Sequence, residues 1–140
     1  MITTSDIADI LYEKCAEAFG MRVYRRGNIP EGLVKEERVV ILPKDQSPET
    51  YWRKSFVEVN ICVPDIKKGV ADIARLQELE RKAVLVFKDA SGESDSSHYA
   101  YSINSISGMN RDEGLGCHYV NVRLLFEILN VMNDETFYWN

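Results

Sequence analysis

The sequence predicts a single α+β domain over residues 1–140, a mostly antiparallel sheet of about five strands with two helices. Two kinds of periodicity favour this class. Segments such as FVEVNICV and HYVNVRLLFEIL alternate apolar and other residues, as half-buried strands do, and two further segments repeat apolar residues at helical spacing. The elements follow in the order helix, strand, strand, strand, helix, strand, strand. A chain of 140 residues is long enough to bury one core of its own.

The first helix is expected over residues 3–19. Thr3 is followed three residues later by Asp6, which resembles a capping box, and Gly20 ends the helical pattern. One face of this segment is apolar, with Ile7, Ile10, Leu11, Cys15 and Ala18. The opposite face is acidic, with Asp6, Asp9, Glu13 and Glu17. The acidic face is consistent with a solvated surface and also with contact to a cation or a basic partner.

Three strands are expected between the first helix and the second. They cover residues 21–26, 38–43 and 56–63. A Gly/Pro loop separates the first two strands, and a polar, turn-rich stretch with Tyr51 and Trp52 follows the second. The third strand has one wholly apolar face, with Val57, Val59, Ile61 and Val63. We expect that face to pack beneath a helix.

The second helix is expected over residues 67–88. Its predicted inward positions are Val70, Ile73, Leu76, Ala83 and Phe87. Residues 89–97 are small and acidic, which predicts a mobile loop. Two strands then cover residues 98–106 and 117–129, and the three glycines of the stretch between them fit a long hairpin loop over residues 107–116.

The composition favours a protein made in the cytosol and without a membrane span. No window holds the roughly 18 apolar residues that a span needs, and the N-terminus lacks the basic and then apolar order of a signal peptide. Cys15, Cys62 and Cys117 are odd in number and widely spaced. They are therefore predicted to be reduced thiols and not a disulfide framework.

The charge balance argues against direct, sequence-specific binding of nucleic acid. The net charge is -5, whereas affinity for nucleic acid rests mainly on neutralising phosphates with Lys and Arg. The sequence contains one local basic cluster, Arg22, Arg25, Arg26 and Lys35. This cluster fits either the solvated ends of a strand and loop or a small basic patch.

No catalytic, metal or cofactor site is predicted. Only His98 and His118 could act as a histidine base, and Cys117 and His118 are neighbours in a predicted strand, so their side chains should point to opposite faces. Cys62 could reach His118 if the third and fifth strands were adjacent, although a half-buried thiol is the simpler explanation. No Cys/His spacing typical of a zinc site occurs.

Two groups of aromatic residues are candidate contacts with a partner or with another copy. One group is Tyr51 and Trp52 in the polar stretch, and the other is Phe137, Tyr138 and Trp139. Aromatic residues are enriched at the cores of protein interfaces. The same residues could instead fold back on their own core, and the sequence leaves both interpretations open.

The sequence resembles the small tail-terminator and tail-completion proteins of long-tailed bacteriophages, also called minor tail or neck proteins. Four features carry the resemblance: a short first helix ending in FGMRVYRRGNIPEG, the strand RVVILP, the alternating strand FVEVNICVP that feeds into a helix of about twenty residues, and a hairpin ending in HYVNVRLLFEIL. These features span nearly the whole chain. They are patterns of elements, so no functional residue is transferred from them.

The resemblance implies a non-enzymatic phage or prophage structural protein found in the virion or the cytoplasm of the bacterial host. Such proteins have a sheet flanked by two helices and assemble into a ring, often a hexamer, which caps the tail tube and meets the head-completion proteins. The implied partners are therefore further copies of the chain, the tail-tube protein and the head-completion proteins, with no cofactor. Two alternatives remain open: a small cellular α+β protein-binding or adaptor module, and an enzyme that uses Cys62 or Cys117 with His118.

Overall fold

The computed structural model describes residues 2–44, 52–94 and 97–129. The helices are α1 (Thr4–Phe19) and α2 (Ile73–Val86). The strands are β1 (Arg22–Arg25), β2 (Arg38–Pro43), β3 (Trp52–Pro64), β4 (Ala90–Ser94), β5 (Ser97–Asp112) and β6 (Cys117–Leu129). Neither described helix has the length and apolar content needed to cross a membrane.

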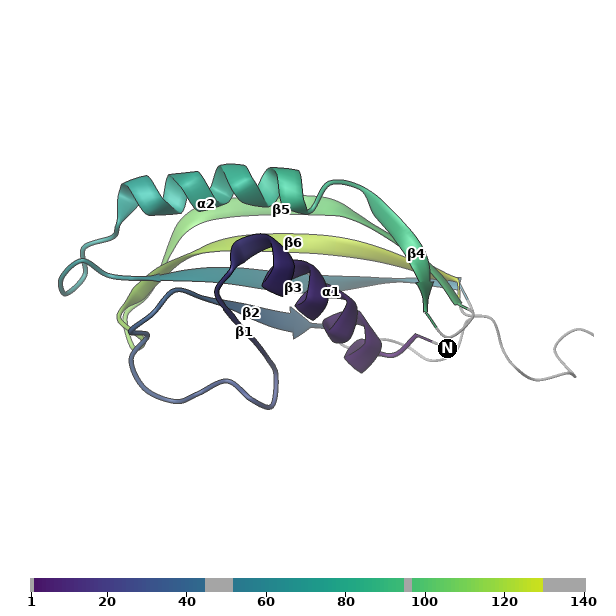
Figure 1. Ribbon diagram of the computed structural model, residues 1–140, viewed down its shortest axis with the longest axis horizontal. Helices are drawn as coiled ribbons and strands as arrows, with labels where there is room; N and C mark the ends of the chain where they lie inside the picture. Colours follow the sequence, from purple (N-terminus) through teal and green to yellow (C-terminus); the bar gives the residue numbers. More distant parts are fainter. Residues whose placement is uncertain (1, 45–51, 95–96, 130–140) are drawn as a thin grey trace, which may run out of the picture.

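The six strands form one sheet in the order β1-β2-β3-β6-β5-β4. Every pair is antiparallel except β1 with β2, which is parallel. Both helices lie on the same face of the sheet, with α1 over β1 and β2 and α2 over β5 and β6 (Figure 1). The α+β class and the mostly antiparallel sheet are therefore confirmed, but the sheet has one strand more than the sequence predicted.

The ends of α1 follow the predicted signals. The Thr3 hydroxyl accepts a hydrogen bond from the Asp6 amide at 3.2 Å, and the Thr3 amide donates to the Asp6 carboxylate at 2.8 Å, so the capping box is present. Gly20 ends the helix with a φ of 63°, a left-handed conformation that glycine adopts without steric cost. The helix buries Ile7, Ala8, Leu11, Cys15 and Phe19.

The core lies between the helices and the central strands β3 and β6. Val57 pairs with Leu124, Val59 with Val122 and Ile61 with Val120, and all six side chains are 0% exposed. The predicted apolar face of the third strand is thus confirmed as the covered face. Leu76, Leu79, Ala83 and Phe87 close the core from the α2 side.

The second helix begins later than the predicted residue 67, and its N-terminal inward positions were wrong. Asp72 caps α2 by accepting a hydrogen bond from the Arg75 amide at 3.3 Å, after a turn in which Lys67 bridges to Val70. Val70 and Ile73 are therefore 39% and 53% exposed. Leu79, which was not predicted to face inward, is 1% exposed.

The predicted mobile loop at residues 89–97 was wrong for most of its length, because it contains β4. This strand pairs with β5 from Ala90–Tyr101 to Ser94–Ser97. A Cβ on Gly92 would lie 2.7 Å from the Tyr99 hydroxyl, so the absence of a side chain at Gly92 leaves room for the Tyr99 ring. Pairing with a long neighbour, and not local sequence, makes this segment a strand.

The predicted hairpin loop at residues 107–116 is much shorter in the structure. The strand expected over 98–106 continues to Asp112 as β5, and residues 113–116 alone connect it to β6. The pairing of β5 with β6 shifts register between Ser107 and Asn110, and Met109, which lies in this irregular stretch, has a φ of 59°. The bounds predicted for β2 and β6 are confirmed, whereas β3 starts four residues earlier than the predicted residue 56.

Candidate functional site: the open face and the two ends of the sheet

The face of the sheet opposite the helices carries half-buried, mostly polar side chains. In its centre, the Asn121 side-chain amide donates a hydrogen bond to the Asn60 side-chain oxygen Oδ1 at 2.7 Å. Beside them, the Arg123 guanidinium lies 4.0 Å from the centre of the Phe56 ring. We call this surface the open face, because neither helix covers it (Figure 1).

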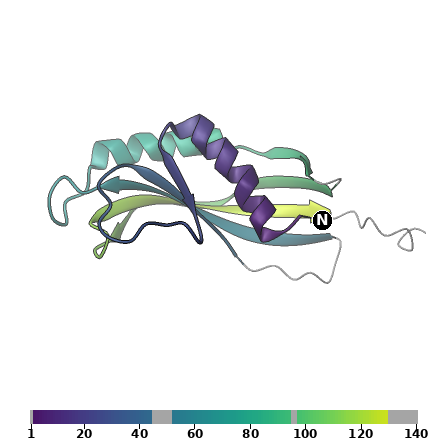
Figure 2. The same cartoon turned by 60° about the horizontal axis from the view of Figure 1, so that its bottom comes forward.

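At one end, the segment between β1 and β2 folds onto the open face (Figure 2). The Val34 amide donates to the Leu115 carbonyl at 2.8 Å, which joins this segment to the turn between β5 and β6. A small second core forms beneath it from Val34, Val40, Cys62 and Cys117. All three cysteines of the chain are buried free thiols, in agreement with the predicted reduced state.

The thiols of Cys62 and Cys117 belong to the same small core. The influence of Cys117, with the positive charge of nearby Arg38, lowers the pKa of Cys62 against the opposing effect of burial. The influence of Cys62, together with burial, raises the pKa of Cys117. In the main core, burial raises the pKa of Cys15 to about 12 against the opposing effect of the Lys14 charge.

A Cys–His pair of the kind used in nucleophilic catalysis is not formed. Strands β3 and β6 are neighbours, but Cys62 pairs with Tyr119, whereas His118 pairs with Val63 on the covered face. Successive side chains of a strand point to opposite faces, so neither Cys62 nor Cys117 shares a face with His118. The His118 ring nitrogen Nδ1 is instead 2.6 Å from the Asp65 carboxylate, with both side chains largely buried.

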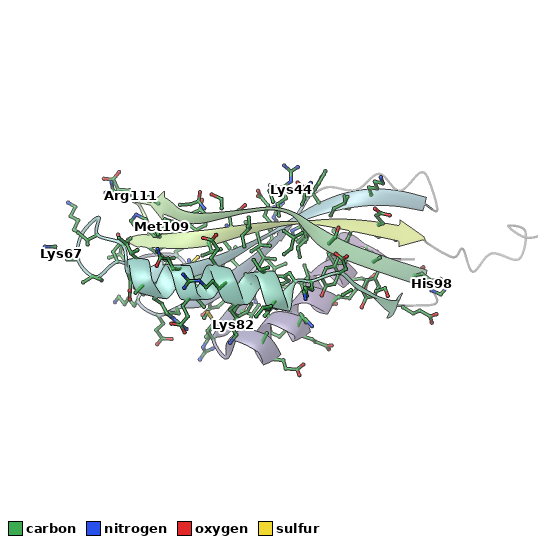
Figure 3. All side chains as sticks on the ribbon, turned by 90° about the horizontal axis from the view of Figure 1, so that it is seen from above. Lys44, Lys67, Lys82, His98, Met109 and Arg111 are labelled. Atoms are coloured by element: carbon green, nitrogen blue, oxygen red, sulfur yellow. The ribbon has the colours of Figure 1, made fainter. Side chains whose placement is uncertain are left out.

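The end of the sheet where β6 begins contains a cleft of about 410 Å³. Three segments meet there: the segment before β2, the turn after β3, and the turn between β5 and β6. The last two are joined by a hydrogen bond from the Asp65 amide to the Gly116 carbonyl at 3.0 Å. We call this site the hairpin-end cleft; its lining includes Leu33, Lys67, Lys68, Gly69, Arg111 and Glu113. Lys67, Met109 and Arg111 project from this end of the molecule in Figure 3.

The cleft is basic and has an exposed apolar rim. Leu33, which lines the cleft, is 63% exposed, and Ile66, next to Lys67 in the sequence, is 68% exposed. Gly69 has a φ of 78°, and a Cβ there would lie 3.0 Å from the Arg111 guanidinium, so glycine lets the cation approach the turn. Sequence reasoning missed this cleft because it assigned residues 67–72 to a helix.

At the opposite end of the sheet, the two segments that carry the predicted aromatic contacts connect to neighbouring strands, β3 and β6. Trp52 is the first residue of β3 and pairs with Leu129, the last residue of β6. Tyr51 and the group Phe137, Tyr138 and Trp139 lie outside the described residues. The two candidate contact segments are therefore joined to the sheet at neighbouring positions, although they are far apart in the sequence (Figure 1).

The basic cluster predicted at the first strand is partly used inside the fold. The Arg25 guanidinium pairs with the Asp9 carboxylate and donates to the Ser5 hydroxyl at 2.7 Å, which fastens α1 to β1. One of the four cations therefore holds a helix in place. The same contact gives Asp9, from the predicted acidic face of α1, a structural partner.

Comparison with known proteins shows the fold and no function. No protein-family model matches the sequence, and no curated protein matches it. A solved structure, of a protein whose name states no activity, superposes with a TM-score of 0.55 and 12% sequence identity. The match covers 89% of this chain and 97% of the other, so the similarity concerns the whole fold.

Proposed function

We propose that this chain is a non-enzymatic structural protein of a phage or prophage tail, of the tail-terminator or tail-completion type, which forms a ring at the end of the tail that joins the head. The observation that carries the proposal is the one-sided sheet. Both helices cover one face, which leaves both edge strands, and the part of the other face that the segment between β1 and β2 does not cover, available for contacts.

The edges of the sheet favour association with further copies. Within the described residues, β1 pairs only with β2, and β4 pairs only with β5. An edge strand keeps backbone donors and acceptors that a neighbouring chain can pair with. A contact between two different surfaces of identical copies repeats until the ring closes. The ring would then bind the tail-tube protein on one side and head-completion proteins on the other.

The separation of the cysteines from His118 supports a structural role over a thiol enzyme. Catalysis by a cysteine nucleophile needs a base within hydrogen-bond reach, and His118 lies on the other face of the sheet from both Cys62 and Cys117. Its ring is hydrogen-bonded to Asp65 instead. We therefore assign the function to surfaces and not to a reactive group.

Electron microscopy of the purified full chain, alone and mixed with isolated tail tubes, tests the proposal. We expect closed rings that cap tube ends. The variant Arg123→Glu on the open face should reduce capping, whereas Arg81→Glu on the exposed side of α2 should not. A protein that stays monomeric and leaves the tubes uncapped would instead fit an adaptor module.

A further inference from the structure

We propose that the hairpin-end cleft of one copy binds residues 130–140 of a neighbouring copy, whose sequence is NVMNDETFYWN. This inference rests on the proposed ring, because it adds to the edge strands a second pair of surfaces, at the two ends of the sheet, that would join adjacent subunits. The partner is a second copy of this chain. Three properties of the molecule support the choice: the charge of the cleft, the composition of the segment and the distance between them.

The cleft is lined by three cations, Lys67, Lys68 and Arg111, and by two carboxylates, Asp65 and Glu113. Lys67 and Lys68 are exposed, and neither forms an ion pair within the described residues. Arg111 is 3.7 Å from the Glu113 carboxylate, a loose pair on an exposed surface. The Asp65 carboxylate is already hydrogen-bonded to His118. The cleft is therefore suited to an acidic segment.

An apolar rim lies beside these cations. Leu33 and Ile66 are each more than 60% exposed, and Met109 projects from the same end. Large aliphatic side chains that remain in water at one end of a small domain mark a surface for contact with another protein. The occupant should therefore combine acidic groups with large apolar side chains.

Residues 130–140 have this composition. Asp134 and Glu135 are adjacent, and Phe137, Tyr138 and Trp139 follow within four residues. Carboxylates beside Lys67 and Lys68 would place the aromatic rings within reach of Leu33 and Ile66. Aromatic side chains of this kind contribute most of the binding energy at many interfaces.

The distance rules out an intramolecular contact. The segment leaves the sheet after Leu129, whereas the cleft lies where β6 begins, at Cys117. β6 has 13 residues, so the two ends are about 40 Å apart along the strand. Glu135, the acidic residue farther along the segment, is six residues beyond Leu129 and reaches at most about 21 Å, even fully extended. Binding in the cleft therefore requires another copy.

A contact between opposite ends of identical subunits has the geometry that a ring needs. The donor end of each copy faces the acceptor end of the next, so every subunit makes two contacts, one of each kind. A partner from a different protein would bind one end only, so the contact would not repeat from one subunit to the next. This difference makes the second copy the occupant that the ring favours.

Charge exchange in the full chain tests the inference. Lys67→Glu with Lys68→Glu should raise the concentration needed for assembly at least about tenfold, and Asp134→Lys with Glu135→Lys should do the same. The chain that carries all four substitutions should recover assembly, because the opposite charges again face each other. Lys14→Glu with Lys88→Glu makes the same charge change away from the cleft and should leave assembly unchanged.

A labelled peptide of residues 130–140 gives a second readout by fluorescence anisotropy. It should bind the wild-type chain, bind Lys67→Glu with Lys68→Glu at least about tenfold more weakly, and compete with assembly. Rings that form equally well in both charge variants would overturn the inference and leave the proposed function intact. A monomeric wild-type chain that binds no peptide would overturn both. A monomer that still binds the peptide in the cleft would overturn the ring alone.

Discussion

The two faces of the sheet differ although the same strands build both. Along β3, Val57, Val59 and Ile61 are 0% exposed beneath the helices, whereas Glu58 and Asn60 are half-buried on the other side. The covered face is closed by segments of the same chain. Among the described residues, the open face has one such cover, the segment before β2, which shields Cys62 and Cys117 at one end.

This difference indicates how one small domain can separate stability from assembly. Apolar burial beneath α1 and α2 supplies the driving force for folding, since each buried side chain removes apolar area from water. The open face, the edge strands and the two ends then remain free to vary with partners. Substitutions on the covered face should therefore change stability, and substitutions elsewhere should mainly change association.

The largest effect should come from the covered face. Phe126 is fully buried and stacks on Tyr101 with ring centres 5.0 Å apart, so Phe126→Ala should lower the free energy of unfolding by about 3–5 kcal/mol in urea titrations. Leu125→Ala is the matched control, because Leu125 is the residue of β6 just before Phe126 and points to the open face. The free energy of unfolding that Leu125→Ala loses should stay below about 1.5 kcal/mol. Equal losses would mean that the two faces do not differ.

Alkaline pH should weaken the covered core through Cys15. Its pKa is about 12 in the folded protein and near 9.0 when the chain is unfolded. Between these two pKa values the unfolded state binds fewer protons than the folded state, so the free energy of unfolding falls as the pH rises above 9. Below pH 9, the contribution of Cys15 to stability is fully present. From pH 8 to pH 10, the wild type should lose about 1 kcal/mol more than Cys15→Ala. Identical losses in urea titrations would show that Cys15 is accessible to water.

The ion pair between Glu37, in the segment before β2, and Arg75 of α2 should contribute to stability about as much as Cys15 does. The Arg75 guanidinium donates two hydrogen bonds to the Glu37 carboxylate, at 2.6 and 2.8 Å, and both side chains are about one-third exposed. A double-mutant cycle with Arg75→Gln and Glu37→Gln should give a coupling of about 1 kcal/mol. A coupling near zero would mean that the helix does not hold this segment.

The smallest effect is expected in the centre of the open face. Asn121→Ala removes the hydrogen bond to Asn60, but water can replace the lost partner on a half-buried surface. The cost in unfolding free energy should stay below about 1 kcal/mol. A loss above about 2 kcal/mol in the monomer would show that this face is as closed as the one under the helices.

Elements with strong local signals could be predicted from the sequence. The capping box and Gly20 define α1, the run RVVILP predicted β2, and alternation predicted β6; both strands have their predicted bounds. β4 could not be predicted in this way, because Ala90–Ser94 is poor in strand-forming residues and depends on pairing with β5. The same limitation explains why β5 was predicted too short.

The candidate site was less accessible from the sequence. Helical spacing placed Val70 and Ile73 on the inner face of α2, but the Asp72 cap starts the helix after a turn and leaves both exposed. The hairpin-end cleft joins residues from three distant segments, so no local pattern could reveal it. The aromatic residues proposed as contacts were identified by composition alone, and their role stays a prediction.

The mass of the full wild-type chain in solution tests the proposed ring most directly. Light scattering over a wide range of concentrations should show a defined oligomer, such as a hexamer, that dissociates on dilution without loss of the fold. A single mass of 16.0 kDa at every concentration, with no assembly on tail tubes, would contradict the account.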